Sequence, residues 1–106
     1  MINKIYSMLG LAMKAGKMVC GTDVCIENIK GKKAFLVVVA NDASDNTKEK
    51  LKRICEQYEV KFVYFGDKFS LSAAVGKVDK AIYAVLDKGF SEKILQLVEE
   101  QKEAMD

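Results

Sequence analysis

Three glycine–lysine pairs and one glycine-led helix start are the positions of this sequence best suited to bind an anion. The pairs lie at 16–17, 31–32 and 76–77, and each joins a conformationally permissive backbone to a cation. The helix start is Gly21-Thr22-Asp23, where free N–H groups and the positive end of the helix dipole attract phosphate. Thr22 adds a hydroxyl donor. Because each pattern is also common in ordinary turns, only a fold that gathers several of them would make a phosphate-binding surface.

Motifs for covalent catalysis or metal binding are not found in the sequence. Histidine is absent, which removes the base of a serine or cysteine triad and the commonest metal ligand. The nearest approach to a P-loop runs from Gly10 to Lys17, but its glycine spacing is wrong and Met18 follows it. Asp42 and Asp45 could hold a magnesium ion, although turn and helix-cap roles explain them more simply. We therefore expect neither enzyme activity nor a cofactor.

The three cysteines, Cys20, Cys25 and Cys55, have no C-x-x-C spacing, and each sits among apolar neighbours. This pattern predicts reduced, buried thiols in a cytoplasmic protein. The N-terminal residues do not have the design of a signal peptide, and no apolar run reaches the length of a transmembrane helix. We therefore expect no membrane association.

Charge is distributed unevenly along the chain. Residues 1–40 contain six lysines against Asp23 and Glu27, whereas residues 91–106 contain two lysines against five acidic residues. The basic N-terminal part could bind the phosphate backbone of a nucleic acid. The simpler alternative is that these lysines form an ordinary solvent-exposed surface.

Hydrophobic periodicity predicts alternating helices and strands. Apolar residues at helical spacing predict a first helix that begins at residue 2 and ends at Gly16. They predict a second helix from residue 22 to Gly31, capped by Thr22 or Asp23. A third helix is expected after the turn and cap residues at 41–47, with Leu51, Ile54, Cys55 and Tyr58 on its inner face. A short helix is expected up to Gly76. Ser91 with Glu92 is expected to open and cap the last helix, whose polar end at 99–106 we expect to fray. Strands are expected at 18–20, 35–40, 61–65 and 81–86.

The strand at 35–40 is continuously apolar, which is typical of a strand covered on both faces. Crossovers of helical length between strands favour layers of helices on both sides of a sheet. We therefore predict one α/β domain over residues 1–106, a three-layer α/β/α sandwich with a mixed sheet of about four strands.

Five short sequence motifs, spread over nearly the whole chain, occur in an order that points to a known protein family. They read LGLA at 9–12, KAGKMVCG at 14–21, KAFLVVVANDASDNT at 33–47, LSAAVGK at 71–77 and DKGF at 87–90. In this order they resemble the kink-turn RNA-binding ribosomal proteins of the L7Ae/L30e type, and especially their small bacterial YlxQ-like members. The resemblance implies an α/β/α domain that binds structured RNA.

The resemblance also implies where RNA would bind. In the family, a G-[TA]-N-E-x-x-K stretch opens the second helix, and its polar residues read the sheared G·A pairs of a kink-turn. Gly21 and Thr22 match this stretch, whereas Asp23, Val24 and Glu27 stand where Asn, Glu and Lys are usual. Asp23 loses amide donors, Val24 cannot hydrogen-bond a base, and Glu27 reverses a charge.

A second contact loop of the family, before the last strand, matches residues 76–80, and Leu71-Ser72 replaces the usual Leu-Gly just before it. Lysines outnumber the acidic residues near these stretches, so we expect contacts that depend on backbone charge and RNA shape, with the lysines flanking one face. The predicted RNA-binding residues are Lys17, Gly21, Thr22, Asp23, Val24, Glu27, Lys30, Lys32, Lys33, Gly76, Lys77, Val78 and Lys80.

Two interpretations of function are therefore open. The first is an RNA-binding protein associated with the ribosome or rRNA, monomeric and cytoplasmic, that binds neither DNA nor membranes. The second is a protein-interaction domain that keeps the fold but has lost the kink-turn readout, with its surface on the altered second helix and the acidic last helix.

Overall fold

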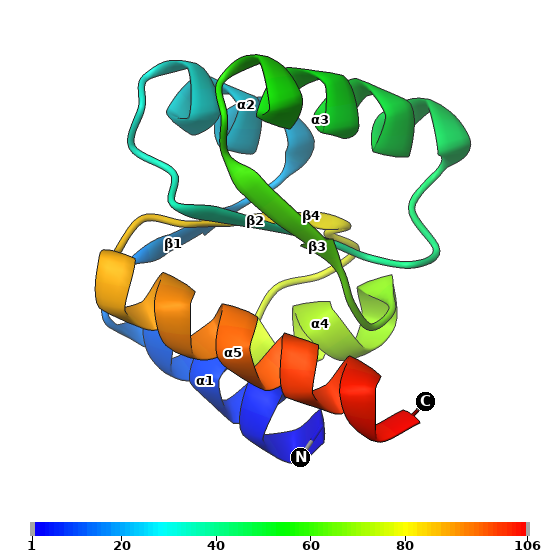
Figure 1. Ribbon diagram of the computed structural model, residues 1–106. Helices are drawn as coiled ribbons and strands as arrows, with labels where there is room; N and C mark the ends of the chain where they lie inside the picture. Colours follow the sequence, from blue (N-terminus) through cyan, green and yellow to red (C-terminus); the bar gives the residue numbers. More distant parts are fainter. Residues whose placement is uncertain (1, 106) are drawn as a thin grey trace.

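The computed structural model describes residues 2–105 as three layers, with a four-stranded sheet between two layers of helices (Figure 1). Helices α1, α4 and α5 cover one face of the sheet, and α2 and α3 cover the other. The predicted three-layer α/β/α fold with a mixed sheet is confirmed. The elements are α1 (Ile2–Lys14), β1 (Met18–Cys20), α2 (Thr22–Lys30), β2 (Leu36–Val39), α3 (Asp45–Gln57), β3 (Lys61–Tyr64), α4 (Lys68–Val75), β4 (Ile82–Val85) and α5 (Lys88–Met105).

The sheet has the strand order β1-β4-β2-β3. Strand β2 runs parallel to β3, and β4 runs antiparallel to both of its neighbours, β1 and β2. The parallel pair requires a crossover connection, which α3 supplies. Leu36 at the start of β2 pairs with Lys61 of β3 on one side and with Val85 of β4 on the other.

Each face of the sheet buries its own hydrophobic cluster. Alternation along β2 sends Leu36 and Val38 toward α1, α4 and α5, and sends Val37 and Val39 toward α2 and α3. All four residues of β2 are buried, as predicted from the continuous apolar run at 35–40, although Phe35 at the start of that run lies outside the strand and is 50% exposed. All four residues of β4 are buried as well. The two central strands therefore fix the layers that carry the candidate site.

The start of α2 differs from the prediction. We expected Thr22 or Asp23 to cap this helix, but the capping position is Gly21, and no side chain accepts a hydrogen bond from the first turn. Asp23 lies inside the first turn, where its negative charge interacts favourably with the positive end of the helix dipole.

The last helix also begins earlier than predicted, at Lys88 rather than Ser91. The Phe90 N–H donates to the Asp87 Oδ2 at 2.8 Å, so Asp87 performs the capping role that we had assigned to Ser91. The helix continues to Met105, and residue 106 lies outside the described residues, so the fraying expected of this polar end stays a prediction.

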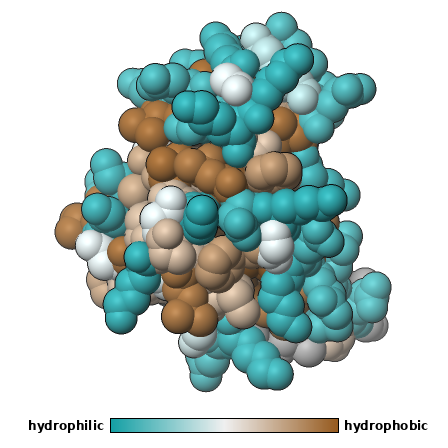
Figure 2. Space-filling model, turned by 90° about the vertical axis from the view of Figure 1, so that its left-hand side faces the viewer, coloured by the Kyte–Doolittle hydropathy of each residue, from teal (hydrophilic) through white to brown (hydrophobic). Residues whose placement is uncertain are grey.

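Figure 2 faces the end of the molecule at which β1, β2 and α5 begin. Hydrophobic side chains gather across the middle of this face, and hydrophilic side chains lie above and below them. Within the described part of the chain, no helix is both long enough and apolar enough to cross a bilayer.

Candidate nucleic-acid interface

Gly21 begins the candidate site because it turns the chain from β1 into α2. Its N–H donates to the Ile82 carbonyl at 2.9 Å, which ties the helix start to β4. Its φ is 103°, a conformation that strains residues with a side chain. A Cβ built on Gly21 would lie 4.0 Å from the Lys80 Nζ. The space on the Cβ side of Gly21 is therefore open apart from the Lys80 ammonium, and the first turn of α2 has no side-chain cap, which together suit an anion.

A hollow of about 320 Å³ lies at this helix start and joins four segments of the chain. Thr22 comes from α2, Ser44 from the start of α3, Lys68 from the start of α4, and Lys80 from the α4–β4 loop. The remaining lining residues are Gly21, Ala43, Thr47, Asp79 and Ala81. The starts of three helices thus meet two lysines, and the start of α2, which has no side-chain cap, supplies free N–H donors of the kind that phosphate favours.

A buried hydroxyl network holds the backbone of Lys80 in this hollow. Ser72, only 3% exposed, accepts a hydrogen bond from the Lys80 N–H at 2.9 Å and lies 3.0 Å from the Tyr83 hydroxyl. The Tyr83 hydroxyl donates to the Lys80 carbonyl at 2.9 Å. Burial raises the pKa of Tyr83, so its hydroxyl keeps the proton that it donates at neutral pH. These hydrogen bonds therefore explain why a serine stands at position 72, where the resembled family has glycine.

The three departures from the family motif lie on the outer surface of α2. Asp23 and Glu27 are exposed, and Val24 is 44% exposed. None of the three lines the hollow, whereas Gly21 and Thr22 do. Asp23 and Glu27 are one helical turn apart, so they add two negative charges beside the hollow.

The loop that follows α4 presents the other predicted contacts. Gly76 ends α4 in the left-handed conformation with φ 73°, and the Lys77 N–H donates to the Ser72 carbonyl. Val78 is 82% exposed, and Asp79 forms a 4.0 Å ion pair with Lys68. The loop is therefore anchored at both ends, and its apolar tip stands in solvent.

The predicted lysines divide into two groups rather than flanking one face. Lys80 lies beside Gly21, which bonds to Ile82 at the first residue of β4. Lys17 instead accepts a hydrogen bond from Leu86, just past the other end of β4. Lys30, Lys32 and Lys33 lie at the C-terminal end of α2 and in the loop after it. The register of β4, which the sequence did not reveal, separates these lysines from the hollow.

Six lining residues are absent from the predicted set: Ala43, Ser44, Thr47, Lys68, Asp79 and Ala81. The Ser44 Oγ accepts from the Thr47 N–H at 3.2 Å and caps α3. Lys68 is placed by its own N–H, which donates to the Asp42 Oδ1 at 2.9 Å. Asp42 therefore has the turn role that we preferred to a metal site, and the described residues contain no cluster of potential metal ligands. The Ser-x-x-Thr capping pattern was the one signal for Ser44 and Thr47.

The cysteines do not contribute to this site. Cys25 and Cys55 are buried, as predicted, whereas Cys20 is half-buried. Burial raises the pKa of Cys25 to about 12 and that of Cys55 to about 11, so neither is a thiolate at neutral pH. The Cys25 Sγ donates weakly to the Ile82 carbonyl at 3.6 Å.

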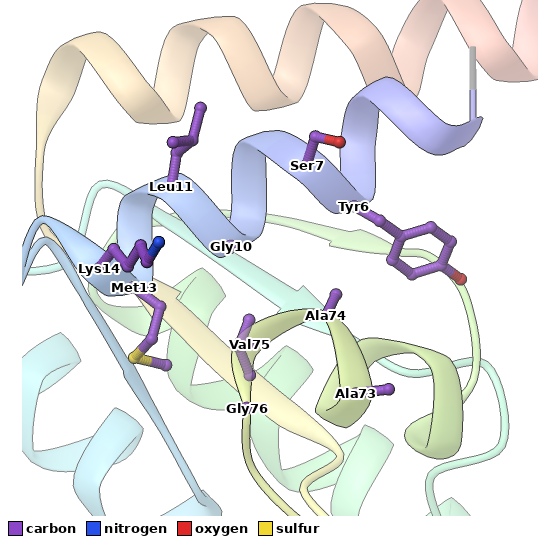
Figure 3. Close-up of a pocket in the computed structure, with 10 residues that line it drawn as sticks. All are labelled: Tyr6, Ser7, Gly10, Leu11, Met13, Lys14, Ala73, Ala74, Val75 and Gly76. Atoms are coloured by element: carbon purple, nitrogen blue, oxygen red, sulfur yellow. The ribbon is translucent and has the colours of Figure 1, made fainter.

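A larger hollow of about 640 Å³ lies between α1 and α4 (Figure 3). It exists where Gly10 allows the two helices to approach, since a Cβ on Gly10 would lie 2.9 Å from the Ala74 carbonyl oxygen. Its lining is largely apolar, and Lys14 is its one charged residue. It therefore offers packing surface rather than groups for chemistry.

Comparison with known proteins gives a family and close relatives. The model of the ribosomal protein L7Ae/L30e/S12e/Gadd45 family matches residues 3–95. The chain is 38% identical over 96 residues to the RNA-binding protein YlxQ of Enterococcus faecium, covering 91% of this chain and 92% of that protein. It is 35% identical over 94 residues to the RNA-binding protein YlxQ of Bacillus subtilis (strain 168), covering 89% and 94%.

A solved structure gives the same fold. A protein with unknown function from Bacillus halodurans C superposes with a TM-score of 0.88 at 31% identity, over 91% of this chain and 97% of that one. The similarity spans nearly the whole length of each protein, so it includes both the hollow and the sheet that positions it.

Proposed function

The chain belongs to the ribosomal protein L7Ae/L30e/S12e/Gadd45 family, and we propose that it is an RNA-binding protein associated with rRNA or the ribosome. It recognises structured, kink-turn-like RNA through the start of α2 and the α4–β4 loop. One observation carries this proposal: the hollow in which Thr22 and Ser44, at two helix starts, meet Lys68 and Lys80. The names of the two YlxQ relatives support RNA as the ligand.

The chemistry of the hollow suits phosphate more than base edges. The N–H groups of the first turn of α2, which begins at Thr22 and has no side-chain cap, and the ammonium groups of Lys68 and Lys80 attract phosphate without reading sequence. Val24, on the outer surface of α2, cannot replace the hydrogen bonds that a glutamate would make to a base. Recognition therefore depends on the shape of the bent RNA backbone more than on direct readout.

The remaining properties follow from this role. The protein acts as a cytoplasmic monomer that positions RNA, without catalysis, a cofactor, DNA or a membrane as partner. Binding draws on the predicted residues beside the hollow, and Lys17, Lys30, Lys32 and Lys33 at the far end of α2 and β1 extend the contact along the RNA backbone.

The test is a filter-binding titration of a kink-turn RNA and an unkinked duplex of the same length across a salt series. We expect tighter binding of the kink-turn, with affinity that falls linearly on a double-logarithmic salt plot. Replacing Lys80→Gln should weaken binding and reduce the slope by about 0.7–0.9, the value for one phosphate contact. Lys52→Gln, on the exposed surface of α3, is the matched control and should leave the slope unchanged.

Equal binding of both RNAs, or no binding at low salt, would contradict the proposal. The alternative is then a protein-interaction domain, favoured by the acidic outer surface of α5, where Glu92, Glu99, Glu100 and Glu103 surround Leu95 and Gln96.

A further inference from the structure

A second surface lies at the opposite end of the sheet, just before β2 begins. Leu36 at the start of β2 pairs with Val85 at the end of β4. The Phe35 N–H also donates to the Val85 carbonyl, at 2.9 Å, and the Leu86 N–H donates to the Lys17 carbonyl at 2.7 Å. Phe35, Leu86 and Lys17 therefore lie on three neighbouring segments, in one row just outside the strand ends.

Val60, just before β3, extends this row, since β2 and β3 are paired from Leu36 and Lys61 onward. Leu86 and Val60 pack against the cluster beneath α2 and α3. Three apolar residues and Lys17 thus lie at the end of the sheet where β1, β2 and β3 begin, which is the end that Figure 2 faces.

Phe35 is the exposed member of this row. It is 50% exposed, although Ala34 and Leu36 on either side of it are buried. Among the described residues, the aromatic pairs are Tyr6 with Phe65 and Phe62 with Tyr64, so the Phe35 ring has no aromatic partner. Half of a phenyl ring is therefore open to a planar group from solvent.

Lysines surround this ring along the chain. Lys32 and Lys33 precede it, Lys17 ends the row, and Lys88 follows Leu86 by two residues. The acidic residues adjacent in sequence to members of the row are Glu59, before Val60, and Asp87, after Leu86. The Asp87 carboxylate already accepts the Phe90 N–H in capping α5, so lysine is the prevailing charge that a ligand meets.

We propose that this end of the sheet binds single-stranded RNA, with an unpaired base stacked on Phe35 and phosphates on Lys17, Lys32 and Lys33. An aromatic platform bordered by cations is the composition of surfaces that bind single strands. The lysine border complements the negative charge of a phosphate backbone, which favours RNA as the occupant of this surface.

This surface is separate from the hollow. Lys17 and Gly21 stand at opposite ends of β1, four residues or about 13 Å apart along an extended strand. The molecule measures 31 × 30 × 25 Å, so one RNA with a structured part and a single-stranded tail can occupy both ends. The proposal does not require a kink-turn at the hollow and can hold if that recognition fails.

The direct test uses the absence of tryptophan from the sequence. Phe35→Trp introduces a single indole at the proposed platform, and a ten-nucleotide oligouridine is titrated into it. A base stacked on the indole should quench its emission, and the midpoint should move to higher RNA concentration as salt is added. Phe69→Trp, at a phenylalanine on α4 that is 83% exposed, is the matched control and should keep its emission.

A second variant separates this surface from the hollow. Phe35→Ala should weaken oligouridine binding about tenfold, within the range for loss of one stacked base. It should leave the affinity for a kink-turn RNA without tails unchanged. Unaltered emission from Phe35→Trp, or unaltered oligouridine affinity of Phe35→Ala, would overturn the proposal. Equal loss of both RNAs in Phe35→Ala would overturn the separation of the two surfaces.

Discussion

The serine at position 72 gives the sharpest test of how the α4–β4 loop is positioned. Ser72→Ala removes the Oγ that accepts the Lys80 N–H at 2.9 Å and that lies 3.0 Å from the Tyr83 hydroxyl. The alanine side chain fits the same space, so the change deletes the hydrogen bonds with little effect on packing. The Lys80 N–H then loses its acceptor in a partly buried position.

The magnitude follows from that lost acceptor. Leaving a buried donor unsatisfied costs about 1–3 kcal/mol of unfolding free energy. The Lys80 backbone also loses one of the hydrogen bonds that hold its ammonium group beside Gly21. Because the ammonium is then positioned less well for phosphate, the free energy of RNA binding should also become less favourable. A loss of about 1.4 kcal/mol in binding free energy is a tenfold weaker affinity. We therefore expect a measurable loss of stability together with a loss of up to about tenfold in affinity for kink-turn RNA.

The assay combines urea denaturation with filter binding on the same preparations. Ser7→Ala, at an exposed serine of α1, is the matched control and should change neither quantity. Tyr83→Phe removes the other hydroxyl of the network, and the double variant should lose less than the sum of the single losses, because the two groups share a hydrogen bond. A stable Ser72→Ala variant, or one that loses stability and keeps full RNA affinity, would refute the proposed role of the network.

Four further outcomes are expected. Gly21→Val should fold with a loss of about 1–3 kcal/mol from its positive φ, and should lose RNA affinity because its side chain enters the hollow; unchanged filter binding would remove this helix start from the interface. Glu27→Lys should raise the affinity for kink-turn RNA about tenfold, because it replaces a negative charge near the RNA phosphates with a positive one. Glu92→Lys on α5 should leave this affinity unchanged. Ser91→Ala should keep or raise the urea midpoint, because the buried Ser91 Oγ has no hydrogen-bond partner among the described residues. Burial raises the pKa of the Cys25 thiol to about 12 in the folded protein, so above pH 9 the thiol ionises in the unfolded chain before it does so in the folded one. The free energy of unfolding should therefore fall between about pH 9 and pH 12, and the fall should be shallower in Cys25→Ala.

The fold was predictable because its strongest signals are local. The continuous apolar runs around Val38 and Ala84 predict strands covered on both faces, and the structure buries both strands completely. The helix starts were less predictable, since Asp87 and Ser91 are both good caps and only the structure shows that Asp87 accepts the Phe90 N–H.

The candidate site was predictable only in part, because its residues come from distant segments. Gly21 and Thr22 were found from their own motif, and they line the hollow. Ser44 and Lys68 were not found, since only the packing of α3 and α4 against the sheet brings them there. The lysines were grouped wrongly because Lys17 and Gly21 stand at opposite ends of β1, and Lys30 ends the helix α2 that Gly21 begins.

The central claim is that RNA binds at the hollow formed by the starts of α2, α3 and α4 and by the α4–β4 loop. A titration of ¹⁵N-labelled protein with a kink-turn RNA without tails, followed by amide NMR, tests it most directly. The account predicts that the largest shift changes occur at the amides of Gly21, Thr22, Ser44 and Lys80, with small changes along α5. Changes concentrated on α5, or no changes at saturating RNA, would contradict it.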